Sequence, residues 1–174
     1  NFGRKFLSIS NSALQQSLED QLIVFKERAA LQNAIIHHVK PHGALYNLIA
    51  VNREKAVVVI AAIQHVFKEV KLYVPYGSII EEEAHKNDIE IVYEAFADRV
   101  YNSDLTLVSR MLSSAVITDK IEVLAQVQKI AKKSLVNTAQ FLDKEIKAHT
   151  FCVHGDTRNV IEILEYLHQH LEIL

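Results

Sequence analysis

The stretch Val39-Lys40-Pro41-His42-Gly43-Ala44-Leu45-Tyr46-Asn47 follows the apolar run at residues 35–39 and precedes a long helical pattern. Pro41 fixes its own φ and pushes Lys40 toward an extended backbone, and Gly43 permits a sharp turn. A lysine and a histidine therefore lie where a predicted strand ends and a predicted helix begins. In α/β folds this is the edge where active sites are built.

Two later stretches repeat this arrangement. Val74-Pro75-Tyr76-Gly77 and Val153-His154-Gly155-Asp156 also follow apolar runs of strand length and precede helical patterns. Both prolines and three of the four glycines of the chain fall in these three places. The pattern predicts a β-turn-α unit that is used several times, with its exits on the same edge of one parallel sheet or barrel.

The bulk composition fits one globular domain over residues 1–174. The formal net charge of −2 and the lack of a basic stripe give no reason to expect nucleic acid as a partner. No apolar run approaches the roughly 18 residues that cross a bilayer, so no membrane partner is expected. Cys152 is the only cysteine, which fits a reducing cytoplasm. Because the chain starts with Asn1, we expect the natural N-terminus to lie upstream.

Apolar periodicity and capping residues predict alternating helices and strands. The predicted helices cover residues 10–31 after a Ser8 or Ser10 cap, 44–67, a short segment after Gly77, 119–131 after a Thr118 or Asp119 cap, and the C-terminal segment after an Asp156 or Thr157 cap. The predicted strands cover residues 35–40, 70–75, 89–97, 115–117 and 150–153. Residues 105–114 are predicted to be irregular, and residues 134–147 to have mixed, partly helical character. The order predicts an α/β fold with a parallel sheet covered by helices.

Polar residues gather at the predicted strand exits. They are Lys40, His42, Tyr76, Glu94, Asp98, Arg99, His154 and Asp156. Parallel strands would bring them to one face, where this mixture of acids, bases and cations suits hydrolysis or phosphoryl chemistry. Lys40 is either a point charge for phosphate or carboxylate, or a solvent-facing strand end. His42 is either a general acid-base or metal ligand, or a histidine bonded to its own turn.

Two carboxylates end the predicted third strand. The even separation of Glu94 and Asp98 places both on one face of an extended strand. They could share base and metal-binding duties, or Asp98 could pair with Arg99 or Arg110. Arg99 could also clamp an acidic substrate with two hydrogen bonds.

The remaining motifs are less informative. His154 is expected to face the shared edge, and Asp156 to act at least partly as a helix cap. The other seven histidines and Cys152 are interpreted as structural or solvent-facing. The sequence contains no P-loop, Gly-x-Gly-x-x-Gly, His-Glu-x-x-His or Gly-x-Ser-x-Gly motif, so none of these identifies the function.

Four blocks together resemble the LamB/YcsF family, the A component of bacterial 5-oxoprolinase. They are residues 39–47, 94–101, 107–110 and 152–156, in the family's order and approximate spacing. The opening Asn1-Phe2-Gly3-Arg4-Lys5 resembles the family's Gly-Phe-Gly-Arg-Arg segment. Family members usually carry acidic and His/Cys motifs upstream of that segment, and often Pro-Gly where this chain has Ser113-Ser114. We therefore expect the sequence to be the C-terminal two-thirds of a longer chain.

The resemblance implies an irregular (β/α) barrel of the glycoside hydrolase/deacetylase type, incomplete at its N-terminus. It also implies one component of an ATP-dependent 5-oxoprolinase, a cyclic amide hydrolase that opens 5-oxo-L-proline to L-glutamate with the B and C subunits of 5-oxoprolinase. A lactam carbonyl is a poor electrophile, and phosphorylation of its oxygen by ATP would supply a leaving group. A divalent metal, with His42 and Asp98 as candidate ligands, and a homo-oligomer are further expectations.

The resemblance also carries an assignment of roles. The implied catalytic residues are Lys40, His42, Asp98 and His154, and the implied substrate-binding residues are Tyr46, Glu94, Arg99, Arg110 and Asp156. Lys40 and Arg99 would neutralise phosphate or carboxylate, and Asp98 and His42 would handle protons or a divalent ion. Two alternatives stay open: a metal-dependent amide or sugar deacetylase that acts alone, and a non-catalytic scaffold or binding subunit.

Overall fold

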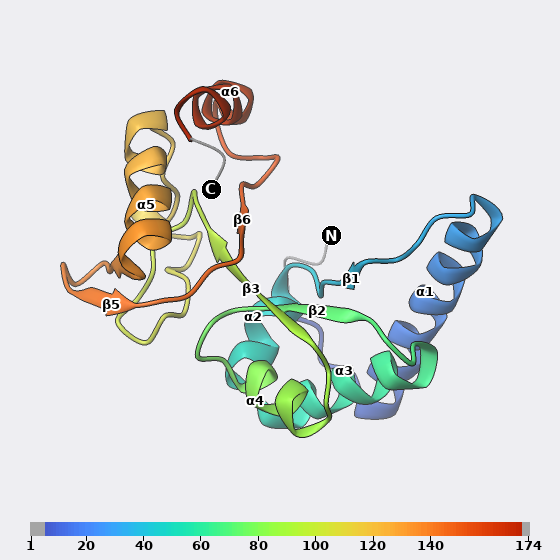
Figure 1. Ribbon diagram of the computed structural model, residues 1–174. Helices are drawn as coiled ribbons and strands as arrows, with labels where there is room; N and C mark the ends of the chain where they lie inside the picture. Colours follow the sequence, from blue (N-terminus) through green and yellow to red (C-terminus); the bar gives the residue numbers. More distant parts are fainter. Residues whose placement is uncertain (1–5, 172–174) are drawn as a thin grey trace. The chain divides into compact units, whose positions relative to one another are not determined.

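The computed structural model describes residues 6–171, which form a mixed α/β structure (Figure 1). The opening Asn1–Lys5 motif lies outside the described residues. The chain divides into two compact units, Asn1–Val92 and Tyr93–Leu174. The order of the strands in the larger sheet is β1 (His38–Val39), β2 (Lys71–Val74), β3 (Ile91–Phe96) and β6 (Thr150–Cys152). That residues 1–174 form one domain stays a prediction.

From residue 6 onward, the first unit combines four helices with a parallel strand pair. Its elements are α1 (Asn11–Leu31), β1 (His38–Val39), α2 (Ala44–Val51), α3 (Arg53–Val66), β2 (Lys71–Val74) and α4 (Ile79–Lys86). In the parallel pair, His38 lies opposite Lys71 and Val39 lies opposite Leu72. Side-chain caps explain where three helices begin. Ser10, Asn52 and Ser78 accept hydrogen bonds from the first turns of α1, α3 and α4.

The predictions for this unit are partly wrong. The first predicted strand shrinks to His38–Val39, and Ile35 is 95% exposed. The predicted helix over residues 44–67 is two helices, because Asn52 adopts an extended backbone and caps α3. The apolar stripe along α2 and α3 is confirmed at Ile49 and Ile60, which are buried.

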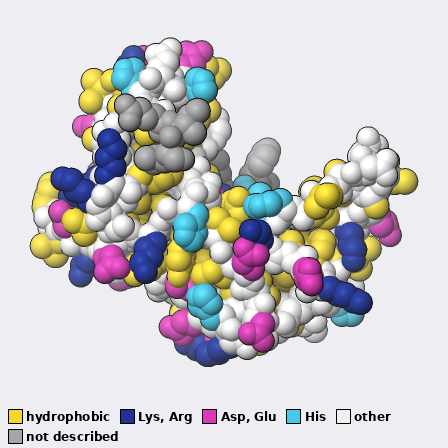
Figure 2. All heavy atoms as spheres, in the orientation of Figure 1, with side chains coloured by type: hydrophobic (Ala, Val, Ile, Leu, Met, Phe, Trp, Pro, Cys, Tyr) yellow, Lys and Arg dark blue, Asp and Glu magenta, His cyan; other side chains and the backbone are white. Residues whose placement is uncertain are grey.

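Helix α1 is less amphipathic than its leucine spacing predicts. Leu14, Leu18 and Leu22 are only half-buried, and Phe25 is exposed. Hydrophobic side chains are accordingly visible among charged ones on the surface of the molecule (Figure 2). No described helix is both long and apolar enough to cross a membrane.

The second unit places two helices around the end of a parallel strand pair. Its elements are β3 (Ile91–Phe96, which begins in the first unit), η1 (Ser113–Ala115), α5 (Lys120–Lys133), β4 (Leu135–Asn137), β5 (Asp143–Glu145), β6 (Thr150–Cys152) and α6 (Val160–His170). Strands β3 and β6 are parallel, and Phe96 lies opposite Cys152. Ala97 packs in a buried cluster with α5 and α6 side chains, including Val123 and Ile163. This cluster anchors the point where β3 ends.

Local signals located some elements of this unit and missed others. The Asp119 cap of α5 is confirmed. The irregular course predicted for residues 105–114 is confirmed up to Leu112, and Ser113 and Ser114 belong to η1. The predicted strand at residues 115–117 is a single bridge, from Arg99 to Val116. The partly helical character of residues 134–147 is wrong, because β4 and β5 form an antiparallel pair there. Helix α6 begins after Asn159, so the predicted Asp156 or Thr157 cap is also wrong.

Candidate functional site

The second unit places Asp98 just beyond β3, with its side chain fully buried. Its Oδ1 lies 2.8 Å from Nδ1 of His154. Its Oδ2 accepts hydrogen bonds from the backbone N–H of His154, at 2.9 Å, and from Oγ1 of Thr157, at 2.5 Å. All three donors belong to the turn between β6 and α6. One carboxylate therefore organises the turn that carries His154.

These contacts set the charge of Asp98 and the tautomer of His154. Burial raises the pKa of Asp98, but the hydrogen bonds from His154 and Thr157 outweigh it and hold that pKa below its ordinary value. An ionised carboxylate only accepts hydrogen bonds, so Nδ1 of His154 carries the proton. In the neutral ring, Nε2 then keeps its lone pair and can accept a proton.

The imidazole of His154 is held but not enclosed. Its ring stacks on Phe96, with centroids 5.1 Å apart and an interplanar angle of 14°. The His154 side chain keeps 24% of its surface exposed. A carboxylate-oriented histidine with a partly exposed ring has the geometry of a general base.

Replacing Thr157 with valine should lower the free energy of unfolding by about 1.5–3 kcal/mol near neutral pH, because a buried carboxylate loses a hydrogen bond. The pKa of folded Asp98 lies below 3.8, so its stabilising contribution is complete above pH 3.8 and is lost as pH falls through the lowered folded pKa. The variant raises that folded pKa, so its difference from the wild type should shrink on acidification below pH 3.8. Urea unfolding over a pH series measures both effects.

Thr106 offers a matched control. Its hydroxyl donates to the exposed carboxylate of Asp104 at 2.6 Å, and this hydrogen bond lowers the pKa of Asp104 as well. Water can replace the lost bond there, so Thr106→Val should cost about 0.5 kcal/mol or less. If Thr106→Val and Thr157→Val lowered the free energy of unfolding equally, burial of Asp98 would not strengthen the contribution of its hydrogen bond.

Two arginines, Arg99 and Arg110, lie near Asp98 and His154. Nη1 of Arg110 lies 2.9 Å from Oδ2 of Asp156, and both side chains are partly exposed. Among the described residues, Asp98 is bonded to His154 and Thr157 and forms no ion pair with Arg99 or Arg110. The ion-pair interpretation of Asp98 is therefore wrong, and Arg110 pairs with Asp156 instead.

Arg99 is buried against the irregular loop. Its Nε donates to the carbonyl of Ala115 at 3.1 Å, and its Nη2 to the carbonyl of Val108 at 2.6 Å. Burial lowers the pKa of Arg99, and the neighbouring cation of Arg110 lowers it further. These contacts let Arg99 hold the loop in place, while its role as a clamp on substrate stays a prediction.

The sequence did not single out two residues of this site, Thr157 and Phe96. It singled out Glu94 without indicating which residues Glu94 contacts. Thr157 was interpreted only as a helix cap, although it follows His154 within one turn. Phe96 is the last residue of β3, two residues before Asp98, and this closeness in sequence was the available signal. Glu94 is buried in β3, opposite Thr150.

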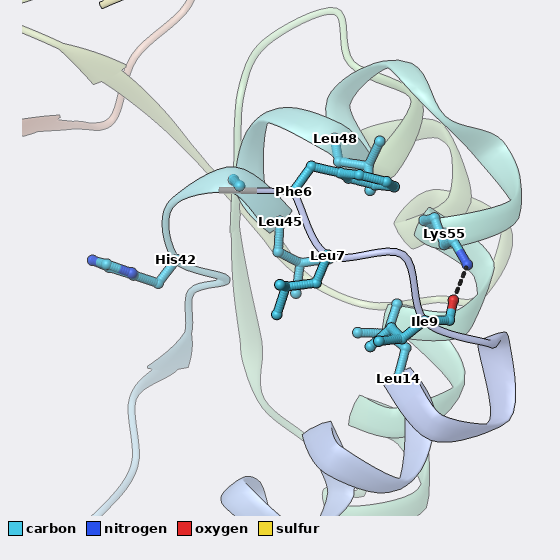
Figure 3. Close-up of a pocket in the computed structure, with 9 residues that line it drawn as sticks. Phe6, Leu7, Ile9, Leu14, His42, Leu45, Leu48 and Lys55 are labelled. Carbon is cyan, nitrogen blue, oxygen red and sulfur yellow. Dashed lines mark hydrogen bonds between the residues drawn. The ribbon is translucent and has the colours of Figure 1, made fainter. Parts of the chain in front are cut away.

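The first unit holds Lys40, His42 and Tyr46. Nζ of Lys40 lies 5.7 Å from the centroid of the buried Tyr46 ring, a cation–π contact. His42 is exposed at the border of an apolar pocket of about 150 Å³, lined by Phe6, Leu7, Ile9, Leu14, Ala44, Leu45, Leu48 and Lys55. The His42 ring points away from the other lining side chains (Figure 3). That these three residues share one site with Asp98 and His154 stays a prediction.

The side chains around Asp98 are a poor match for the expected metal. Within residues 6–171, no three His, Cys, Asp or Glu side chains gather as a metal site. Both oxygens of Asp98 already accept hydrogen bonds from His154 and Thr157. Ligation by His42 and Asp98 stays a prediction.

Comparisons with known proteins agree with one another. The sequence model of the LamB/YcsF family matches residues 1–173. The chain is 38% identical over 162 residues to the protein of Acinetobacter baumannii that is named as the A subunit of 5-oxoprolinase, covering 93% of this chain and 64% of that protein. It is 34% identical over 173 residues to the Bacillus cereus protein of the same name, covering 99% and 68%. The chain thus spans 64–68% of the length of these relatives.

A solved structure is similar as well. It is the crystal structure of the lactam utilization protein from Thermus thermophilus, with a TM-score of 0.85 and 28% sequence identity. The match covers 96% of this chain and 68% of that chain.

Proposed function

The chain belongs to the LamB/YcsF family, and from this membership we propose that it is part of the A subunit of an ATP-dependent 5-oxoprolinase. The reaction opens 5-oxo-L-proline to L-glutamate. Relatives at 34–38% identity are named as that subunit, and the related solved structure is called a lactam utilization protein. The observation that carries the proposal is the buried Asp98 carboxylate that orients His154.

The proposed chemistry uses Nε2 of His154, the ring nitrogen that carries no proton. Opening a lactam requires water to add to the carbonyl carbon and the ring nitrogen to leave with a proton. Nε2 of His154 takes a proton from the attacking water and returns it to the ring nitrogen as the C–N bond breaks. Asp98 stabilises the imidazolium that exists between these two transfers. ATP, consumed as a co-substrate, would phosphorylate the carbonyl oxygen and leave as ADP. Cleavage of the C–N bond would then give an acyl phosphate, which a second water would hydrolyse to L-glutamate and inorganic phosphate.

We assign the carboxylate of 5-oxoproline to Arg110. Its guanidinium is partly exposed, and Asp156, which it contacts, lies two residues after His154. A guanidinium binds a planar carboxylate with two parallel hydrogen bonds. Asp156 therefore occupies the position of the substrate carboxylate and competes with it.

Replacing Asp156 with asparagine should lower KM for 5-oxoproline about two- to fivefold, because a partly exposed ion pair holds Arg110 by about 0.2–1 kcal/mol. The value of kcat should stay within about twofold. Replacing Arg110 with methionine should raise KM instead. Initial rates at varied 5-oxoproline concentration measure both parameters. A higher KM in Asp156→Asn would place Asp156 on the substrate rather than in competition with it.

Lys40, His42 and Tyr46 of the first unit complete the assignment of roles to residues. Lys40 would neutralise phosphate near the start of α2, where Gly43 contributes no side-chain cap. His42 would carry protons, and Tyr46 would support Lys40 through its ring. We further propose that the full-length protein is an irregular (β/α) barrel of the glycoside hydrolase/deacetylase type. It would act in the cytoplasm with the B and C subunits.

A reconstitution experiment tests the function. The full-length protein is combined with its two proposed partner subunits, and glutamate and ADP are measured with each component omitted in turn. Glutamate should form only with all three proteins and ATP, with one ADP per glutamate. Glutamate formation by this protein alone without ATP would favour an amide hydrolase that acts by itself. Undiminished turnover without this protein would overturn the proposal.

A further inference from the structure

Gln126 of helix α5 forms hydrogen bonds with the backbone around Asp98. Nε2 of Gln126 lies 2.9 Å from the carbonyl oxygen of Phe96, 3.1 Å from that of Ala97 and 3.0 Å from that of Arg99. These three carbonyls flank Asp98 on both sides. A single amide group therefore bonds the backbone before and after the buried carboxylate.

The position of these carbonyls explains why such a donor is needed. Strand β3 ends at Phe96, and after the hydrogen bond from the N–H of Ala97 to the carbonyl of Cys152 the chain leaves the parallel pairing with β6. Backbone carbonyls in a buried turn need donors from elsewhere. The two protons of one NH₂ group serve three acceptors, so at least one proton is shared.

The helix that delivers this amide is firmly packed. Val123 and Val127, on either side of Gln126 in sequence, belong to the buried cluster that also contains Ala97. Gln126 thus connects a rigid helix to the turn at Asp98. It also bonds the backbone of Phe96, whose ring stacks on His154. Both partners of the His154 imidazole depend on backbone that Gln126 holds.

We propose that Gln126 is a positioning residue of this site, which aligns the Asp98 carboxylate and the Phe96 ring with the imidazole of His154. It acts through the backbone of residues 96–99 and does not itself touch the reacting atoms. The inference can be tested by enzyme kinetics and by NMR. The kinetic test rests on the proposed function, whereas the NMR test depends only on the geometry of His154.

The test compares Gln126→Met with Gln128→Met. Methionine keeps the length of glutamine but cannot donate a hydrogen bond, and Gln128 lies on the same helix and is also half-buried. In the full-length protein with its partner subunits, Gln126→Met should lower kcat at least about tenfold and leave KM within about twofold. Gln128→Met should match the wild type. A loss confined to KM would contradict a role in aligning His154.

Histidine-selective ¹⁵N NMR of the full-length protein gives the second readout. The low-field Nδ1–H signal of His154, assigned by its absence from His154→Asn, should weaken or shift in Gln126→Met and persist in Gln128→Met. An unchanged signal in a folded Gln126→Met would overturn the proposal, whatever its turnover. If Gln126→Met does not fold, Gln126→Asn, which shortens the donor by one methylene, is judged by the same two criteria. A wild-type complex without 5-oxoprolinase activity would refute the proposed function and leave the NMR result decisive for Gln126.

Discussion

Replacing Asp98 with asparagine should lower kcat for glutamate formation on the order of 10³–10⁴-fold, as loss of the carboxylate does in other histidine–aspartate pairs. The asparagine oxygen can still accept from the backbone N–H of His154 and from Thr157. Its NH₂ group then faces Nδ1 of His154, which must become an acceptor. The proton moves to Nε2, where the ring can no longer take one from water. Steady-state kinetics of the full-length complex measure the loss.

Asparagine is preferable to alanine at this position. Alanine would leave the Thr157 hydroxyl and the His154 N–H buried without an acceptor, at a cost of about 1–3 kcal/mol for each group. Asp119→Asn is the control, because Asp119 caps α5 and asparagine caps helices equally well. Wild-type turnover in Asp98→Asn would remove the His154–Asp98 pair from the mechanism.

Replacing His154 with asparagine should lower kcat about 10²–10⁴-fold, because the proposed general base is lost. The asparagine amide nitrogen occupies the place of Nδ1 and can still donate to Asp98, so the turn should stay folded. His149→Asn is the matched control in the same unit. Nδ1 of His149 accepts from the backbone N–H of Tyr93 at 3.1 Å, a bond that the asparagine oxygen can replace.

The double variant distinguishes a functional pair from two independent contributions. If Asp98 acts only through His154, Asp98→Asn combined with His154→Asn should be no slower than the slower single variant. Multiplied losses would mean that Asp98 has a role of its own. Circular dichroism of each protein verifies that the loss is not one of folding.

Local chemistry explains which elements were predictable. Helices α1 and α5 follow directly from Ser10 and Asp119, because a cap acts on the residues beside it. The β4–β5 pair escaped prediction because its sequence lacks the usual signals of a hairpin. Strand β5 is Asp143-Lys144-Glu145, and residues 138–142, which connect the two strands, contain neither glycine nor proline. The apolar run at residues 35–39 likewise predicted more strand than the two residues that pair with β2.

In the site, too, some features could be predicted from local sequence and others could not. Strand ends and turns could be predicted, and they put Asp98 and His154 at the exits of β3 and β6. The partner of Asp98 could not, because it depends on how the turn at residues 153–159 folds back on the carboxylate. Charge alone favoured Arg99 or Arg110. Their guanidinium groups instead bond backbone carbonyls and Asp156, respectively.

The bonds of Asp98 to His154 and Thr157 join residues 56 and 59 positions apart. During translation, the carboxylate leaves the ribosome long before the turn that satisfies it. Until residue 157 emerges, the Asp98 side chain must remain in water, because burying it without donors is unfavourable. The contacts of Asp98 with His154 and Thr157 can therefore form only after synthesis has passed β6.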